Sequence, residues 1–424
     1  MIVSGGPHGN ALMYRLVSQL VHHPRLLRML AGVLREWPGI SRVIPVVAQR
    51  NTVAAILERQ SSFSNTSHAP NLMAGEFVIG MDAGARQRED RAFLQRILPS
   101  AAVCAAESAA ESTRLIERFT QSPDRVFDLI DDYLVPITWK PLRLALGAAA
   151  DAIASGGDGG LANARPPQKF IATLRSLAAQ LITGSAATAS VRQRVEAGAA
   201  DLNRRVIDQL QALQQEWEQA APGDSAAMLR NAVGYLWVSH PVTVQAGALM
   251  IQELLGRPRV HRELASQARE LQATAWTHHH FRELLRNHVL ELLRFRPVFP
   301  ILRRDVPRAT LFDIGTQFPT RADAGSTMTL LVIGAMFDDS AMEDANAAAY
   351  RPGREFKSEH DRYLIFGMGP RACIAQHQAV EILVSALAGL LLLPRLRWAD
   401  PWYTRIKYEG PAICKLRLRF DDGR

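Results

Sequence analysis

Helical periodicity runs through most of this sequence and limits what the chain can fold into. Apolar residues recur every three or four positions in one segment after another, which predicts amphipathic helices around a shared core. From Ala11 to about Arg59 this pattern is broken at Pro24 and Pro38, with a short extended segment near 43–47. The further predicted helices span Arg86–Arg96, Ala105–Gln121, Pro123–Leu134, Gln168–Thr183, Ala186–Ala220, Ser225–Leu255, Val260–Ala273, His278–Phe295 and Gln376–Leu393.

Strands are expected to be few. Between Leu311 and Met336 the pattern changes to alternating Thr, Val, Ile and Leu, which predicts short strands joined by turns. The segment 148–168 is rich in Gly and Pro, but helical patterns of similar composition flank it, so we expect a mobile loop rather than a linker between domains. The sequence therefore predicts a single, mainly α domain over residues 1–424 with a small β-sheet part.

Composition places the chain among globular proteins. Of its 424 residues, 48% are apolar, which allows a large core. No apolar run reaches the roughly 20 residues that a membrane span needs, and the first residues lack the pattern of a secretory signal. Three cysteines are too few for a disulfide framework, which fits a reducing compartment. We expect a cytoplasmic protein with no membrane partner.

The charge distribution argues against a nucleic-acid partner. The net charge is +8, but lysine and arginine are spread along the chain and form no basic tract. A diffuse excess of arginine fits the recognition of carboxylates or of an acidic protein partner.

One cysteine has unusual neighbours. Phe366, Gly367 and Gly369 precede Cys373 in FGMGPRACIAQH, and an apolar helix follows. Glycines allow the backbone to approach a flat macrocycle, while the N–H groups and the dipole of the helix start stabilise an anionic sulfur. Arg371 could pair with a carboxylate of such a cofactor. The loop therefore indicates a thiolate ligand of a haem iron, whereas the settings of the other two cysteines are typical of small buried apolar residues.

The loop 366–375 resembles the signature of the cytochrome P-450 family, Phe-Gly-x-Gly-x-(His/Arg)-x-Cys-x-Gly. Ala375 stands where glycine is usual, and an alanine there still permits close packing. This resemblance implies the cytochrome P-450 fold, a helical domain that encloses haem b, with Cys373 as the axial thiolate.

Two further motifs in the expected order strengthen the resemblance. Glu291 and Arg294 resemble the family's Glu-x-x-Arg, and the segment 350–354 (YRPGR) resembles its Phe-x-Pro-x-Arg. In the family these charges form one network. Residues three apart share a helix face, so Glu291 and Arg294 can together hold Arg354 and fix the coil that carries the cysteine loop.

The resemblance also suggests arginines for the haem propionates. Arg303 follows Arg294 by the interval at which the family places a propionate donor, and Arg371 lies in the cysteine loop. An early helix supplies a further donor in the family. Arg86 and Arg91 are both candidates there, because the sequence does not fix the register.

On the distal side the chain departs from the family. Pro241 and Val242 stand where O₂-activating members carry an acid and a threonine, and Thr243 is one residue off. Reductive activation of O₂ requires protons delivered through a hydroxyl and water relay. Either the substrate, Thr243 or Ser239 supplies that relay, or the enzyme uses a peroxide with His240 as its acid–base group. We also expect Pro241 to kink the helix.

The sequence thus predicts a haem-thiolate oxidoreductase that carries out monooxygenase-type oxidation of a small hydrophobic or amphipathic molecule. A ferredoxin or flavoprotein would supply the electrons, because the chain has no flavin or iron–sulfur pattern. The alternatives are a peroxide-using member, either a peroxygenase or a hydroperoxide-rearranging enzyme, and a haem-binding protein without turnover.

Overall fold

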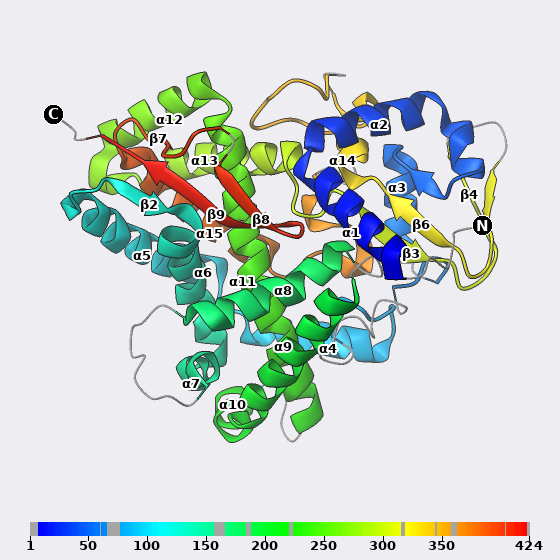
Figure 1. Cartoon of the computed structure of the whole chain (residues 1–424), viewed down its shortest axis with the longest axis horizontal. Helices are drawn as coiled ribbons and strands as arrows, with labels where there is room; N and C mark the ends of the chain where they lie inside the picture. Colours follow the sequence, from blue (N-terminus) through cyan, green and yellow to red (C-terminus); the bar gives the residue numbers. More distant parts are fainter. Residues whose placement is uncertain are drawn as a thin grey trace.

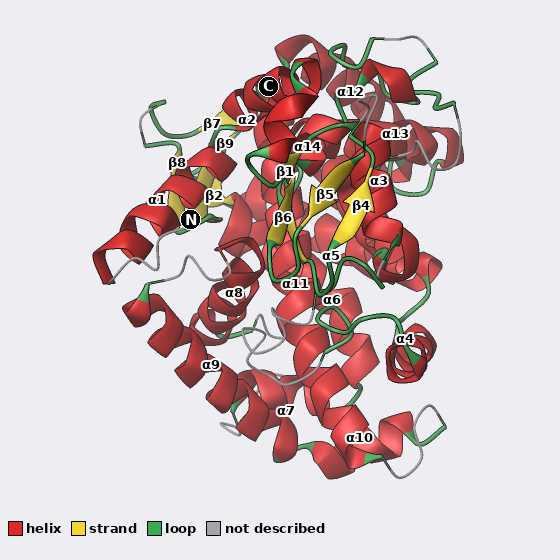
Figure 2. Ribbon diagram, turned by 90° about the vertical axis from the view of Figure 1, so that its right-hand side faces the viewer, coloured by secondary structure: helices red, strands yellow, loops and turns green. Residues whose placement is uncertain are grey.

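The computed structural model describes residues 7–59, 61–65, 77–156, 166–183, 188–219, 224–314, 319–343, 346–357, 363–402 and 404–421. Helices predominate within them and strands are short, so the expected mainly α architecture is confirmed (Figure 1; Figure 2). The α-helices are α1 (Pro7–His22), α2 (Pro24–Glu36), α3 (Arg50–Glu58), α4 (Ala85–Ile97), α5 (Ala101–Gln121), α6 (Val135–Leu142), α7 (Ala149–Ser155), α8 (Gln168–Thr183), α9 (Ala189–Ile207), α10 (Leu210–Trp217), α11 (Ser225–Leu255), α12 (Pro258–Leu271), α13 (His279–Phe295), α14 (Val332–Ala335) and α15 (Gln376–Leu392).

Most predicted helices match within a few residues, but two predictions are wrong. The segment 123–134 contains strand β2 (Val126–Asp128) and a π-helical turn, Leu129–Leu134, instead of an α-helix. The segment 186–220 is divided into α9 and α10. Much of the predicted mobile loop, 157–165, lies outside the described residues, and α7 occupies its beginning.

The strands form three small sheets. β1 (Val46–Val47) pairs in parallel with β6 (Thr327–Leu330), which pairs with β3 (Leu302–Asp305) on its other side. β9 (Ala412–Arg419) joins β2, β7 (Arg397–Trp398) and β8 (Ile406–Glu409) in the C-terminal sheet, shown in red and cyan in Figure 1. The third sheet is the hairpin of β4 (Thr310–Phe312) and β5 (Thr320–Ala322).

Helix α11 runs through the centre of the molecule (Figure 1). It begins where the side chain of Asp224 accepts a hydrogen bond from the N–H of Ala227 at 2.8 Å, and it continues through Pro241. Its residues are apolar almost all round, as expected for a helix packed on every side. At Gly234 a Cβ would lie 2.1 Å from the ring of Phe77, so only glycine allows that close packing.

Within the described residues, three hydrophobic clusters hold these elements together. The largest joins α5, α6, α8, α11, α13 and α15, and the second joins the N-terminal helices to the β1–β6–β3 sheet. The third is a small group of Ala31, Ala48 and Leu331. In the described part of the chain, no helix is both long enough and apolar enough to cross a membrane.

Candidate functional site

The cysteine loop is a tight turn that ends at helix α15. The N–H of Cys373 donates to the carbonyl of Phe366 at 2.8 Å and closes the loop. Gly367 has φ 70° and ψ −169°, a backbone conformation that is essentially restricted to glycine. Gly369 has φ 69°, and a Cβ there would lie 3.2 Å from the carbonyl oxygen of Leu57 in α3. The two glycines thus set both the shape of the loop and its contact with α3.

The thiol of Cys373 opens onto an internal cavity. The side chain is exposed to this cavity, which has a volume of about 350 Å³ and lies between the cysteine loop and α11, and not to the outer surface of the protein. Burial by the surrounding protein raises the pKa of the Cys373 thiol, while a hydrogen bond from the N–H of Ala375 and the charge of Arg91 act in the opposite direction. The start of α15 therefore supplies a donor to the sulfur, as an anionic ligand requires.

Four arginines line this cavity: Arg91, Arg303, Arg304 and Arg371. Arg91 in α4 donates to the carbonyl of Ala372 at 2.8 Å, so it ties α4 to the cysteine loop. Arg371 forms an ion pair with Asp82. Arg304 donates to the side chain of Asn65 at 3.4 Å.

Several guanidinium groups have nitrogens left over. Nη1 of Arg371 and Nε of Arg304 are buried without a hydrogen-bond partner among the described residues. No described residue pairs with the guanidinium of the half-buried Arg303. Burial lowers the pKa of Arg303. Buried unpaired donors of this kind normally have a partner. The carboxylates of a haem fit these donors, and the facing thiol fits its iron.

The structure separates the two candidates of the early helix. Arg91 reaches the cysteine loop, whereas Arg86 is exposed and does not line the cavity. Of the two candidates, the structure therefore places Arg91 at the cavity and leaves Arg86 away from it. Gln87 faces the loop instead, with its side-chain amide 3.1 Å from the carbonyl of Pro370.

Helix α11 presents one face to the cavity. Its lining residues are Tyr235, Val238, Ser239, Val242, Thr243 and Ala246, which follow the helical spacing of three and four. Thr243 donates to the carbonyl of Ser239 at 2.7 Å, and Ser239 donates to that of Tyr235. Both hydroxyl oxygens remain acceptors. Among the described residues that line the cavity there is no Asp, Glu or His.

His240 does not face this cavity. Its ring is buried, Nε2 donates to the carbonyl of Val135 at 3.2 Å, and Trp139 packs against it edge to face. Burial lowers the pKa of His240 to about 4, against a smaller opposing effect of the Val135 carbonyl. Together with Pro241 it lines a separate cavity of about 30 Å³. This geometry does not support the prediction of His240 as a catalytic acid–base group, because the helix turns the imidazole toward α6.

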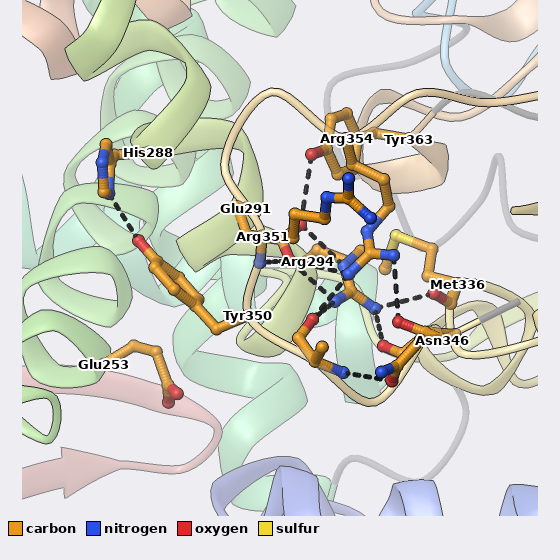
Figure 3. A network of polar contacts seen from close by, with 12 residues as sticks. Glu253, His288, Glu291, Arg294, Met336, Asn346, Tyr350, Arg351, Arg354 and Tyr363 are labelled. Atoms are coloured by element: carbon orange, nitrogen blue, oxygen red, sulfur yellow. Dashed lines mark hydrogen bonds and ion pairs between the residues drawn. The ribbon is translucent and has the colours of Figure 1, made fainter. Parts of the chain in front are cut away.

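The structure brings Glu291, Arg294 and Arg354 together (Figure 3). Arg294 donates to both carboxylate oxygens of Glu291 at 2.8 Å, and Arg354 approaches one of them at 3.4 Å. All three side chains are fully buried. The backbone N–H of Arg351 and the hydroxyl of Tyr363 also donate to this carboxylate, at 2.8 and 3.1 Å.

The arginines extend this network to the backbone. Arg294 donates to the carbonyls of Met336, Ala347 and Ala349, and Arg354 donates to those of Asn346 and Ala349. The network therefore fixes the coil between α14 and the cysteine loop.

Sequence reasoning missed several residues of the site. Asp82 pairs with Arg371, and Gln180 in α8 lines the cavity with a buried amide nitrogen that has no hydrogen-bond partner. Neither belongs to a motif, and Asp82 is 289 residues from Arg371. Arg304 has a signal in the sequence, because it is adjacent to Arg303, the predicted propionate donor, on the same strand.

Comparisons with known proteins find matches among solved structures alone. No protein-family model matches the sequence, and no curated protein matches it. Among solved structures, P450BioI in complex with an acyl carrier protein ligated to hexadec-9Z-enoic acid has a TM-score of 0.70 at 14% identity, with 94% of this chain and 100% of that one covered.

Two further solved structures are similar over comparable lengths. A mutant of EryK in complex with erythromycin B has a TM-score of 0.64 at 16% identity, with 92% and 96% of the two chains covered. CYP109B1 from Bacillus subtilis has a TM-score of 0.61 at 17% identity, with 88% and 93% covered. At such identities the likeness shows a shared fold.

Proposed function

We propose that this chain, which has the cytochrome P-450 fold, is a haem-thiolate oxidoreductase that oxidises a small organic molecule. One observation carries the proposal. The thiol of Cys373 opens onto an apolar cavity whose other side is formed by α11, and unpaired arginine nitrogens line the same cavity. A thiol, an apolar space and guanidinium groups together fit the iron, the macrocycle and the carboxylates of haem b.

The residues of the site would bind different parts of the cofactor. Cys373 would ligate the iron, and Arg303, Arg304 and Arg371 would bind the propionates. Arg91 would position the cysteine loop through the carbonyl of Ala372. When bound, a thiolate-ligated haem supplies the oxidising chemistry, and the protein provides orientation and proton delivery.

Proton delivery would fall to the hydroxyls of α11. Ser239 and Thr243 line the cavity one helical turn apart, and each hydroxyl oxygen can accept a hydrogen bond from water or substrate. Val242 separates them with an apolar surface. We therefore assign Ser239 and Thr243, with ordered water or a substrate hydroxyl, as the relay for O₂ activation in place of an acid and threonine pair.

The residues that line the cavity also indicate the chemical class of the substrate. Apart from the arginines and a few neutral polar residues, the lining is mostly apolar and includes Phe77, Leu98 and Phe299. The amide nitrogen of Gln180, which also lines the cavity, is a donor without a partner among the described residues. A neutral, largely apolar molecule with a hydrogen-bond acceptor such as a carbonyl or hydroxyl fits this lining.

A second candidate function is favoured by one observation. No described residue of the cavity is a carboxylate or an imidazole, so the usual source of protons for O₂ activation is missing. A peroxide brings its own protons and needs no electron donor, which fits a peroxygenase or a hydroperoxide-rearranging enzyme.

The experiment is a comparison of two oxidants. Purified haem-loaded protein is incubated with candidate substrates and either H₂O₂ or a ferredoxin or flavoprotein system with O₂, and the product is measured. Product only with the electron donor supports the monooxygenase, and product only with H₂O₂ supports the peroxide-using enzyme. If neither oxidant gives product although ligands shift the haem spectrum, the chain is a haem-binding protein without turnover.

A further inference from the structure

Helix α2 carries an apolar stripe that faces outward. Leu26, Met29, Leu30, Val33 and Trp37 are exposed by 39, 61, 41, 51 and 69%, respectively. Their spacing of three and four residues places the first four along one side of the helix, and Trp37 follows as the residue that caps its C-terminus. The positions 26, 30, 33 and 37 alternate by four, three and four, which is the spacing of a seam between two helices.

The packing of α2 within the chain does not need this stripe. The opposite side of the helix buries Leu27 and Ala31, and Arg28 and Arg35 also point inward. Arg28 lies over the rings of Phe295 and Phe337, and Arg35 donates to the carbonyl of Gly334 at 2.7 Å. Contiguous exposed apolar surface of this kind marks an interaction site.

One cation and one anion border the apolar stripe, at opposite ends of α2. Arg25 and Glu36 are 11 residues apart, which is about 20° beyond three full turns, so both lie along the same flank of α2. Arg25 stands near the N-terminus of the helix and Glu36 at its C-terminus, where the helix dipole disfavours each charge. Neither has an ion-pair partner among the described residues. Their placement is therefore not explained by the stability of α2 itself.

We propose that α2 pairs with α2 of a second copy of this chain, antiparallel about a two-fold axis. This arrangement places Leu30 opposite Val33 of the partner subunit and Leu26 opposite Trp37 of the partner subunit. In antiparallel helix pairs the same flanks meet, so Arg25 faces Glu36 of the partner subunit, and the symmetry repeats the contact. Each charge then lies near the end of the partner helix that favours it.

The charges also favour a protein partner over a lipid surface. Anionic lipids select a basic border, whereas Glu36 would be repelled at one end of the stripe. Val43 and Ile44, a few residues after α2 in the chain, are exposed apolar residues as well. The self-complementary pattern of cation, apolar stripe and anion thus matches a second copy.

The test is the mass of the full-length protein in solution. Sedimentation velocity at about 1 to 100 μM should show a species of twice the monomer mass of 46.8 kDa. Leu30→Glu should weaken the dimer at least about 30-fold, as expected for a central interface position. Ile207→Glu, at an equally exposed site on α9, is the control and should leave the dimer unchanged.

Charge reversal tests the antiparallel arrangement itself. Arg25→Glu and Glu36→Arg should each weaken the dimer about 3- to 10-fold, and the double variant should restore it. Both reversals suit the helix dipole, so α2 stays folded, which circular dichroism verifies. A wild-type protein that remains monomeric at 100 μM overturns the proposal, and so does a dimer insensitive to Leu30→Glu. Monomeric protein that binds vesicles of phosphatidylglycerol and phosphatidylcholine would assign the stripe to lipid instead.

Discussion

The guanidinium of Arg294 donates to both oxygens of the Glu291 carboxylate at 2.8 Å, and neither side chain is accessible to solvent. The carboxylate also accepts hydrogen bonds from the N–H of Arg351 and from Tyr363. A buried ion pair is expensive to desolvate and depends on such complete hydrogen bonding. One carboxylate thus holds α13 and the coil that leads to the cysteine loop in a single arrangement.

Glu291→Gln should destabilise the protein by about 3 to 5 kcal/mol, because two buried guanidinium groups lose their counter-charge. Chemical denaturation at pH 7 measures this loss. Tyr363→Phe removes only one neutral donor from the same carboxylate and should cost about 1 kcal/mol. Equal losses for the two variants would contradict the central role of the charge.

The effect of Glu291 should depend on pH. Burial alone would raise the pKa of Glu291, but hydrogen bonds from Arg294 and Arg351 and the charges of Arg294 and Arg354 lower it below its ordinary value. A carboxylate with a depressed pKa contributes its stability above its unfolded pKa of about 4.3 and loses it as the pH falls through the folded pKa. The free-energy difference between wild type and Glu291→Gln should therefore shrink below about pH 4.

Cys373→Ser should abolish thiolate ligation. The reduced, CO-treated wild-type protein should show the red-shifted Soret absorption of a thiolate-bound haem, and the variant should lack it. Cys414→Ser is the control, because Cys414 lies in β9 and does not line the cavity. A variant at Cys373 that keeps the wild-type spectrum would refute the assignment of the ligand.

His240→Gln should leave peroxide-driven turnover unchanged, because the imidazole faces Val135 instead of the main cavity. Glutamine keeps a donor near the position of Nε2 and does not titrate. The pKa of His240 falls from 6.5 to about 4 through burial, so the neutral form is favoured in the folded state. Between about pH 6.5 and 4 the wild type should lose roughly 3 kcal/mol more stability than His240→Gln. If the unfolding free energies of the wild type and His240→Gln change equally with pH over this range, burial does not lower the pKa of His240.

The hydroxyls of Ser239 and Thr243 should be needed for turnover with O₂ but not for turnover with H₂O₂. Replacing both with alanine should lower product formed per O₂ consumed by roughly 100-fold, the scale of a lost proton relay. Turnover with H₂O₂ should change little. Thr113→Ala removes a hydroxyl with the same bond to the carbonyl four residues earlier, at a site outside the cavity, and is the matched control. Unchanged coupling in the double variant would exclude these hydroxyls as the relay.

Arg303→Leu should weaken retention of haem. The guanidinium lines the cavity without a partner among the described residues, and a charge-assisted hydrogen bond contributes about 1.5 to 3 kcal/mol. Transfer of haem to an excess of apomyoglobin should therefore be about 10-fold faster or more. Arg308→Leu changes an exposed arginine a few residues away and should transfer haem at the wild-type rate.

The sequence predicted elements whose patterns are local. Helices α8, α11 and α13 follow from apolar periodicity, and the cysteine loop follows from its glycines and the helix after it. The segment 126–128 was predicted as helix and is strand β2, because pairing with β9 nearly 300 residues later outweighs the local preference.

The directions in which side chains point were harder to predict from the sequence. The sequence does not fix the register of α4 and so does not distinguish Arg86 from Arg91, whereas the packing of α4 against the cysteine loop does. The direction of His240 depends on how α11 is rotated, which its almost uniformly apolar surface does not reveal. The pair of Arg371 and Asp82 joins two segments that carry no common pattern.

The contacts of α4 with the cysteine loop constrain when the site can form during protein synthesis. Gln87 and Arg91 reach the carbonyls of Pro370 and Ala372, which are 283 and 281 residues further along the chain. Both donors leave the ribosome long before their acceptors exist. The two walls of the pocket can meet only after nearly the whole chain has been translated, so a nascent chain that stalls before residue 373 has no means of capturing its cofactor.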